Sequence, residues 1–220
     1  MITLHGFGRV PRVVAGVTRD MRVQWALEET GLPYHVHGLD QPAGELEGPE
    51  YRRISCFQQV PVIDDDGFIV AETGAVLLYL AEKSGKLIPP DFEGRTRVVQ
   101  WCFAALNTVE PPLLQIALID LSGGGEEGAE KQRAKLVDWA RLRFEQLERR
   151  LDGREWIACA DFTVADLLLA TVLRQVRKTG LIEGYPRLMD YYERALARPA
   201  WQRTLELHAA RLGVPVEEIR

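Results

Sequence analysis

The chain has 220 residues, of which 46% are hydrophobic and 27% are charged, a balance that is ordinary for globular proteins and argues against extended disorder. Its formal net charge of -5 gives no general attraction to phosphate backbones or anionic lipid, so we expect neither nucleic acid nor a membrane as a partner. The three cysteines are widely spaced without a metal-ligand pattern, and no apolar stretch approaches the roughly 20 residues that span a bilayer. We therefore predict a cytoplasmic protein without a metal site.

The first forty residues are typical of a strand, helix, strand unit. Residues 2–5 predict a short strand, and residues 6–17, rich in glycine, predict a loop. Apolar residues recur at helical spacing over residues 21–30, and Gly31 marks the end of that helix. Residues 34–37 predict a second strand, at the distance that a right-handed parallel crossover requires.

An antiparallel hairpin is expected next. Residues 49–54 favour a short helix, and residues 60–63 and 68–70 predict two strands. Asp66-Gly67 lies between these strands and supplies the positive φ that a tight turn needs. Residues 72–83 then predict a helix that ends at Gly85.

A domain boundary is predicted at Pro89-Pro90, which can continue neither a helix nor a central strand. We expect an α/β domain over residues 1–85, a linker over 86–92 and an all-α helical domain over 93–220. The glycine-rich segment 122–125 predicts a flexible connection between two long helices. The expected helices of the second domain are 94–121, 129–151, 164–178 and 185–212.

Thr163 and Asp166 have the spacing of a capping box, in which each side chain satisfies a backbone N–H group at the start of a helix. Removal of the Thr163 hydroxyl is expected to cost about 1 kcal/mol of stability without a direct effect on activity.

Two segments of the first domain together suggest a peptide site. Pro61 begins a strand, and a cis Val60-Pro61 bond would turn backbone N–H and C=O groups outward, where an extended peptide could pair with them. About ten residues later, Glu72 and Thr73 open a helix with free backbone donors, a hydroxyl and a carboxylate. These groups suit the two charged ends of an amino acid.

The sequence resembles the cytosolic glutathione transferases in four segments, whose order and spacing cover nearly the whole chain. They are FQQVPVI at 57–63, AETGAVLLYL at 71–80, MRVQWALEE at 21–29 and FTVAD at 162–166. The resemblance implies a thioredoxin-like N-terminal domain and an all-α C-terminal bundle, paired into a homodimer. It also implies glutathione as cosubstrate and a small hydrophobic electrophile as the second partner, with a role in detoxification.

The resemblance assigns the glutathione contacts to the first domain. The backbone of Val60, before Pro61, pairs with the cysteinyl part, Glu72 and Thr73 hold the γ-glutamyl end, and Gln59 adds a polar contact. The alternative is that Glu72 only complements a helix dipole and Pro61 only starts a strand.

The residue that activates the thiol is expected near the start of the first helix, where the resemblance implies a hydroxyl or thiol donor. Thr18 is our candidate, serving both as helix N-cap and as donor to the sulfur. Thr18 could instead only cap the helix, and Arg19 could stabilise the thiolate in its place. We interpret Asp20 as a solvated carboxylate of the first turn.

The chain departs from the family pattern at two places. Basic residues that would meet the glycine carboxylate of glutathione are replaced by Glu45-Leu46-Glu47. Arg52 or Arg53 could substitute for them, but we favour the interpretation that both lie on an ordinary solvated face. Ser55-Cys56 stands where Asn-Pro is usual. Cys56 is either catalytic or redox active, or a buried loop thiol.

Three functions remain open at this point. The first is an enzyme, a glutathione transferase that directs the thiolate to an electrophilic carbon, a peroxide or a disulfide. The second is a noncatalytic glutathione-binding or interaction module on the same fold. The third is a glutathione-dependent isomerase. The four histidines show no metal-binding spacing and are assigned no chemistry.

Overall fold

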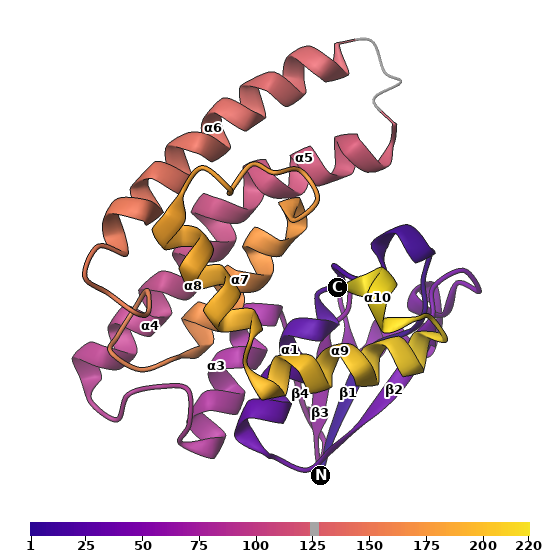
Figure 1. The fold of residues 1–220 in the computed structure, drawn as a ribbon. Coiled ribbons are helices and arrows are strands. Elements are labelled where there is room, and N and C mark those ends of the chain that lie inside the picture. Colours follow the sequence, from indigo (N-terminus) through magenta and orange to yellow (C-terminus); the bar gives the residue numbers. More distant parts are fainter. Residues whose placement is uncertain (124–127) are drawn as a thin grey trace. The chain divides into compact units, whose positions relative to one another are not determined.

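A four-stranded mixed sheet organises the first part of the chain (Figure 1). The computed structural model describes residues 1–123 and 128–220, and its strands are β1 (Ile2–Arg9), β2 (Tyr34–Asp40), β3 (Val62–Asp65) and β4 (Phe68–Ala71). The strand order is β2-β1-β3-β4, with β1 parallel to β2 and antiparallel to β3, and β3 antiparallel to β4. Asp66 and Gly67 have φ values of 51° and 94°, so the predicted hairpin turn is confirmed.

The helices of this part begin and end close to the predicted residues. They are α1 (Asp20–Thr30), α2 (Pro49–Ile54) and α3 (Thr73–Ser84), with short 3-10 turns η1 (Arg12–Val14) and η2 (Glu45–Glu47). Gly31 and Gly85 end α1 and α3 in the left-handed conformation, which a residue without a Cβ adopts at little cost. Leu39, Tyr51 and Val62 contribute to a second, smaller core beside α2.

Two C-terminal helices belong to the same compact unit as the sheet. The unit comprises Met1–Leu87 and Arg198–Arg220, so it includes α9 (Pro199–Leu212) and α10 (Val216–Ile219). The ring of Trp201 lies 4.8 Å from that of Trp25 on α1, and both are buried. Because α9 buries its apolar face against α1, the unit boundaries differ from the predicted single range of 93–220, while the cut after Leu87 falls within the predicted linker.

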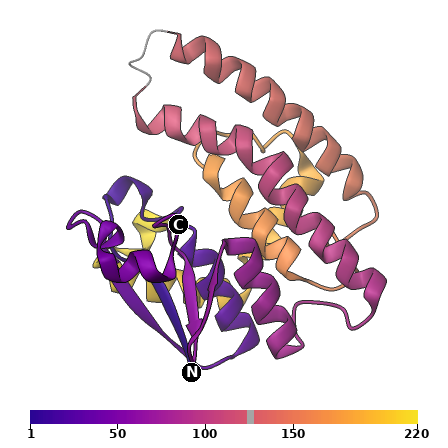
Figure 2. The same cartoon turned by 180° about the vertical axis from the view of Figure 1, so that it is seen from behind.

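The second unit, Ile88–Ala197, is helical (Figure 2). Its elements are α4 (Phe92–Ala104), a π-helical turn η3 (Ala105–Val109), α5 (Glu110–Leu121), α6 (Ala129–Arg150), α7 (Val164–Leu173), a 3-10 turn η4 (Arg174–Val176) and α8 (Pro186–Leu196). The helix predicted over 185–212 is wrong in one respect, because it breaks before Pro199, which opens α9. Residues 124 and 125 of the predicted flexible connection lie outside the described residues.

One helical run of this unit is longer and more apolar than the sequence analysis expected of any segment. Phe92–Leu121 is 30 residues long and, by length and composition alone, could cross a membrane; the core helix of a soluble protein passes the same test. Within the unit, α4 packs against α7, and α5 packs against α6. The run therefore has protein partners along its length.

The predicted capping box at the start of α7 is present. Asp166 is fully buried, and its Oδ2 accepts a hydrogen bond from the Thr163 backbone N–H at 2.9 Å. Its Oδ1 accepts from the backbone N–H of Ile157 at 2.7 Å and from the Tyr191 hydroxyl at 3.2 Å. Burial raises the pKa of Asp166, and these donors oppose that rise. The motif thus ties the start of α7 to the preceding loop and to α8.

Candidate functional site

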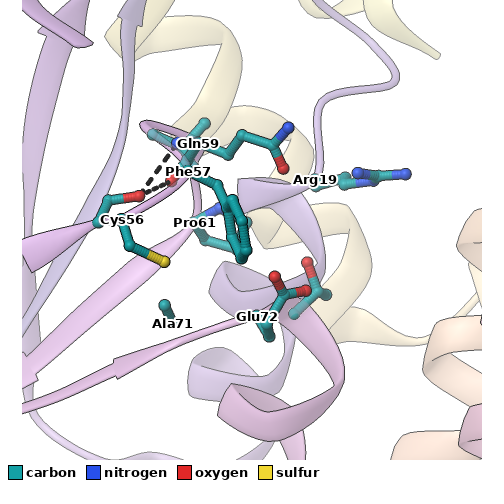
Figure 3. A pocket seen from close by; sticks show the side chains of 10 residues that line it. Arg19, Cys56, Phe57, Gln59, Pro61, Ala71 and Glu72 are labelled. Atoms are coloured by element: carbon teal, nitrogen blue, oxygen red, sulfur yellow. Dashed lines mark hydrogen bonds between the residues drawn. The ribbon is translucent and has the colours of Figure 1, made fainter. Parts of the chain in front are cut away.

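A pocket of about 350 Å³, partly open to solvent, lies where α1, the loop before β3 and the start of α3 meet. Its lining comes from residues 55–57, 59–61 and 71–73, together with Arg19. The structure therefore brings together six of the seven predicted site residues, which are Arg19, Gln59, Val60, Pro61, Glu72 and Thr73. In Figure 3 the side chains of Gln59, Arg19 and Glu72 lie on one side of Pro61, and Cys56 lies on the other.

The loop before β3 is held by hydrogen bonds to Gln59. The Ser55 hydroxyl accepts from the Gln59 N–H at 3.0 Å and donates to the Gln59 carbonyl at 3.1 Å (Figure 3). The Tyr51 hydroxyl donates to the same carbonyl at 2.8 Å, and burial raises the pKa of that phenol. The Val60-Pro61 bond is cis, as the peptide-site hypothesis required. Ser55 and Tyr51 position this loop, and sequence reasoning gave neither of them a role.

Glu72 and Thr73 form the start of α3 beside the pocket. Glu72 has φ 70° and ψ 119°, a positive-φ conformation that is unusual for a residue with a side chain and is one of those that cluster at functional sites. The Glu72 carbonyl accepts from the Val76 N–H at 2.9 Å, so α3 starts directly after it. The buried Thr73 is the first helical residue, where backbone N–H groups have no partner within the helix and attract anions. A carboxylate and an anion-binding helix terminus therefore stand side by side.

The start of α1 differs from the prediction for Thr18. The N-cap position is Arg19, and no side chain caps the helix there, so the expectation that Thr18 caps α1 is wrong. Thr18 is absent from the described lining of the pocket, whereas its neighbour Arg19 contributes to it. The Thr18 hydroxyl lies 3.3 Å from Nε2 of His208 on α9. Because the Thr18 hydroxyl contacts a residue 190 positions later in the sequence, it does not serve as the cap of α1.

The interpretation of Asp20 as a solvated carboxylate is also wrong. Asp20 is fully buried, and its Oδ2 accepts from the Phe7 N–H at 3.0 Å and from Arg211 Nη2 at 3.1 Å. A Cβ at position 6 would lie 2.7 Å from that oxygen, so Gly6 leaves the room that the carboxylate occupies. The cation that compensates the buried charge comes from α9, and no local pattern around Asp20 reveals it.

The sequence matches the family "Glutathione S-transferase, N-terminal domain" over residues 10–82 and "Glutathione S-transferase, C-terminal domain" over residues 144–194. It is 30% identical over 182 residues to the disulfide-bond oxidoreductase YfcG of Escherichia coli, covering 79% of this chain and 84% of the relative. It is also 30% identical over 194 residues to glutathione S-transferase hmp2 of Hypomyces subiculosus, covering 82% and 90%. The chain belongs to the glutathione transferase family.

The structure has the glutathione transferase fold. It is similar to that of a family member from Pseudomonas fluorescens, with a TM-score of 0.83, 27% identity and coverage of 93% of this chain and 92% of the other. That protein was crystallised with two glutathione bound. The predicted fold class, a thioredoxin-like domain followed by a mostly helical region, is confirmed.

The positions at which this chain departs from the family pattern have different surroundings. Cys56 is exposed at the pocket, so the expectation of a buried loop thiol is wrong. Arg52 donates to Gln58 at 3.3 Å, and Arg53 lies 3.6 Å from Glu50. Neither arginine contributes to the described lining of the pocket.

Two polar residues of α9 were assigned no role in the sequence analysis. His208 and Arg211 contact the α1 side of the glutathione transferase domain, and Arg211 donates to the Phe7 carbonyl at 2.9 Å. The only local signal was their i, i+3 spacing, which places both on one face of a helix. That spacing is too common to indicate a contact with the start of the chain.

Proposed function

We propose that this protein is an enzyme that binds reduced glutathione in the pocket of the first unit and uses its thiolate as a nucleophile. The observation that carries the proposal is the convergence of Gln59, Val60, Glu72 and Thr73 on one cavity. The Glu72 carboxylate would take the ammonium group of the γ-glutamyl end, and the start of α3 at Thr73 its carboxylate. The Val60 backbone would pair with the cysteinyl part, and Gln59 would add a polar contact.

Glutathione as cosubstrate is supported by a related protein. The Pseudomonas fluorescens family member, with 27% identity over nearly the full length, holds glutathione in its crystal structure. The pocket here offers a carboxylate and an arginine side chain, Glu72 and Arg19, which match the charged groups of a zwitterionic peptide. A tripeptide with separate positive and negative ends is the ligand that this combination favours.

Thiol activation is assigned to Thr18, with Arg19 as the alternative. A drop of about 2 units in the thiol pKa requires about 3 kcal/mol of preferential anion stabilisation, which a charge-assisted hydrogen bond and a helix N-terminus together can supply. Arg19 is the N-cap of α1 and lines the pocket itself, and Thr18 is the residue before it. Cys56 would be a third participant only if the reaction included a mixed disulfide.

The second substrate is proposed to be a small hydrophobic electrophile, a peroxide or a disulfide. A disulfide is favoured by one specific observation, because a relative with 30% identity is the disulfide-bond oxidoreductase YfcG. Attack of the glutathione thiolate on such a disulfide would form a mixed disulfide and release a thiolate. We expect a cytoplasmic homodimer with the domain division near residues 86–92.

A thiol titration with the intact protein tests the proposal. Calorimetry is expected to detect binding of reduced glutathione at millimolar or lower concentration, and the thiolate absorbance of bound glutathione is expected to develop below pH 8. Turnover should follow with an aryl halide, a hydroperoxide or a small disulfide. Binding without thiolate formation or turnover would favour the noncatalytic module, and product formation without glutathione consumption would favour the isomerase.

A further inference from the structure

Two side chains of α9 reach the loop that leads into α1. The His208 ring is fully buried, and its Nε2 lies 2.9 Å from the Ala15 carbonyl oxygen and 3.3 Å from Thr18 Oγ1. Its other ring nitrogen, Nδ1, lies 2.6 Å from Nη2 of Arg211. The histidine therefore stands between a cation on its own helix and the hydroxyl that is assigned to thiol activation.

The contact with Arg211 decides which nitrogen of His208 carries the proton. A guanidinium group has N–H donors and no acceptor, so the Nδ1 atom that faces it must present a lone pair. In the neutral imidazole the proton is then on Nε2. That Nε2–H donates to the Ala15 carbonyl at the shorter distance and to Thr18 Oγ1 at the longer one.

The tautomer determines what the Thr18 hydroxyl can do. A hydroxyl that accepts from Nε2–H keeps its own proton for another acceptor, whereas in the other tautomer the hydroxyl would donate that proton to the lone pair of Nε2. We propose that His208, oriented by Arg211, is a positioning residue that reserves the Thr18 proton for the glutathione sulfur. This inference rests on the proposed function, in which Thr18 stabilises the thiolate.

Arg211 is itself held in one orientation by the sheet and by α1. Its Nε donates to the Phe7 carbonyl at 2.9 Å, and its Nη1 donates to Gln24 Oε1 at 2.8 Å. Its Nη2 donates to Asp20 Oδ2 at 3.1 Å, as well as contacting His208. With donors engaged on three elements, the guanidinium cannot turn away from Nδ1 without breaking several charge-assisted bonds. The sheet and α1 thereby set the proton position on the ring.

A purely structural role is the rival explanation, because the bond to Ala15 also fastens the loop. The two roles differ in how His208 and Thr18 couple. If His208 acts through the hydroxyl, removing the hydroxyl abolishes its effect on the thiol; if it only fastens the loop, its effect persists in the absence of the hydroxyl.

The first test reads the tautomer directly. In nitrogen-15 labelled protein, a long-range proton–nitrogen spectrum distinguishes the two neutral tautomers, and the His208 signals are assigned by their loss in His208→Gln. We expect a protonated Nε2 and an unprotonated Nδ1. A proton on Nδ1, alone or together with one on Nε2, overturns the proposal.

The second test measures the thiol pKa of bound glutathione in four proteins: the natural chain, His208→Leu, Thr18→Val and the double variant. We expect His208→Leu to raise that pKa by about one unit when Thr18 is present and by a negligible amount in the Thr18→Val background. His208→Gln, whose amide can donate from a similar position, should recover most of the shift. Equal shifts in both backgrounds, or no shift with Thr18 present, overturn the proposal.

A matched control comes from the exposed side of β1 and β2, where Thr3 Oγ1 lies 3.1 Å from His35 Nε2. His35→Leu removes the same kind of pair away from the pocket and should leave the thiol pKa unchanged. Failure of the proposed function is distinguishable, because glutathione would then titrate with its ordinary pKa in the natural chain. If only the positioning role fails, the thiol pKa in the natural chain is still low, but His208→Leu changes it equally with and without the Thr18 hydroxyl, or not at all.

Discussion

The α3 side and the α1 side of the proposed glutathione pocket are held in place in different ways. On the α3 side, Glu72 and Thr73 take their positions from the chain around them, at the point where β4 passes into a helix. On the α1 side, the Thr18 hydroxyl contacts His208, which lies 190 positions later in the sequence. The proposed peptide recognition thus rests on local backbone geometry, while the proposed thiol activation rests on a remote helix.

The two sides of the pocket should therefore differ in how strongly they respond to substitutions in α9. Its contacts with α1 include the buried rings of Trp201 and Trp25, and Arg198, the N-cap of α9, pairs with Glu29 at 2.6 Å. A change in α9 should therefore alter thiol activation and stability more than it alters the α3 contacts. The predictions below test this difference, beginning with the largest effect.

Trp201→Ala is expected to lower the free energy of unfolding by about 4 kcal/mol, because it removes a fully buried ring that packs on Trp25. Urea unfolding measures this loss. Phe144→Ala, in the second unit, removes another fully buried ring and is the matched control for stability. Where the protein remains folded, only Trp201→Ala should raise the thiol pKa of bound glutathione; equal thiol pKa values in the two variants would contradict the dependence on α9.

Asp20→Ala is expected to cost about 3 kcal/mol of stability, because it leaves the guanidinium of Arg211, 14% exposed, without its buried counter-ion. The midpoint of urea unfolding at neutral pH reports the change. The comparison variant is Asp40→Ala, since Asp40 pairs with the exposed Arg9 at 3.4 Å and should contribute less than about 1 kcal/mol. Similar losses of stability in both variants would show that burial does not increase the contribution of the pair between Asp20 and Arg211.

The same contrast explains what the sequence could predict. The hairpin turn, α3 and the starts of β1 and β2 follow from local periodicity and turn chemistry, and the residues Gln59 to Thr73 follow from the family resemblance. Residues 6–9, predicted as part of a loop, instead continue β1 to Arg9. Asp20 was misread because its own neighbours are those of an ordinary first-turn carboxylate, and its partner Arg211 is 191 positions away. The break at Pro199 was missed because apolar residues continue at helical spacing on both sides of it. Contacts of this range are set by packing, which a single sequence does not display.

Glu72→Gln should weaken glutathione binding about tenfold, because a neutral amide forms a weaker bond with an ammonium group than a carboxylate does. Calorimetry measures the affinity, and the free energy of unfolding should change little. Glu82→Gln makes the same replacement on the same helix but outside the described lining of the pocket, so its affinity should match that of the natural chain. The thiol pKa of the glutathione that still binds should be unchanged, since Glu72 belongs to the α3 side.

The smallest predicted effect is a pH dependence of the free energy of unfolding that arises near the C-terminal end of α3. Lys83 Nζ and the Tyr79 hydroxyl each lie 2.5 Å from Asp65 Oδ2, and these hydrogen bonds hold the pKa of that carboxyl below its ordinary value. A carboxyl with a lowered folded pKa stabilises the protein above its unfolded pKa of about 3.9, and this contribution is lost as the pH falls through the folded pKa. Lys83→Met should therefore reduce stability at pH 7 and have progressively less effect below pH 4.

Urea unfolding of the natural chain and of Lys83→Met between pH 3 and pH 7 measures that dependence. Lys86→Met is the control, because Lys86 Nζ donates to the Thr30 carbonyl at 2.8 Å, and this acceptor does not titrate. Its effect on stability should be the same across the pH range. A Lys83→Met difference that stays constant to pH 3 would contradict the prediction, because it would mean that Lys83 does not lower the pKa of Asp65.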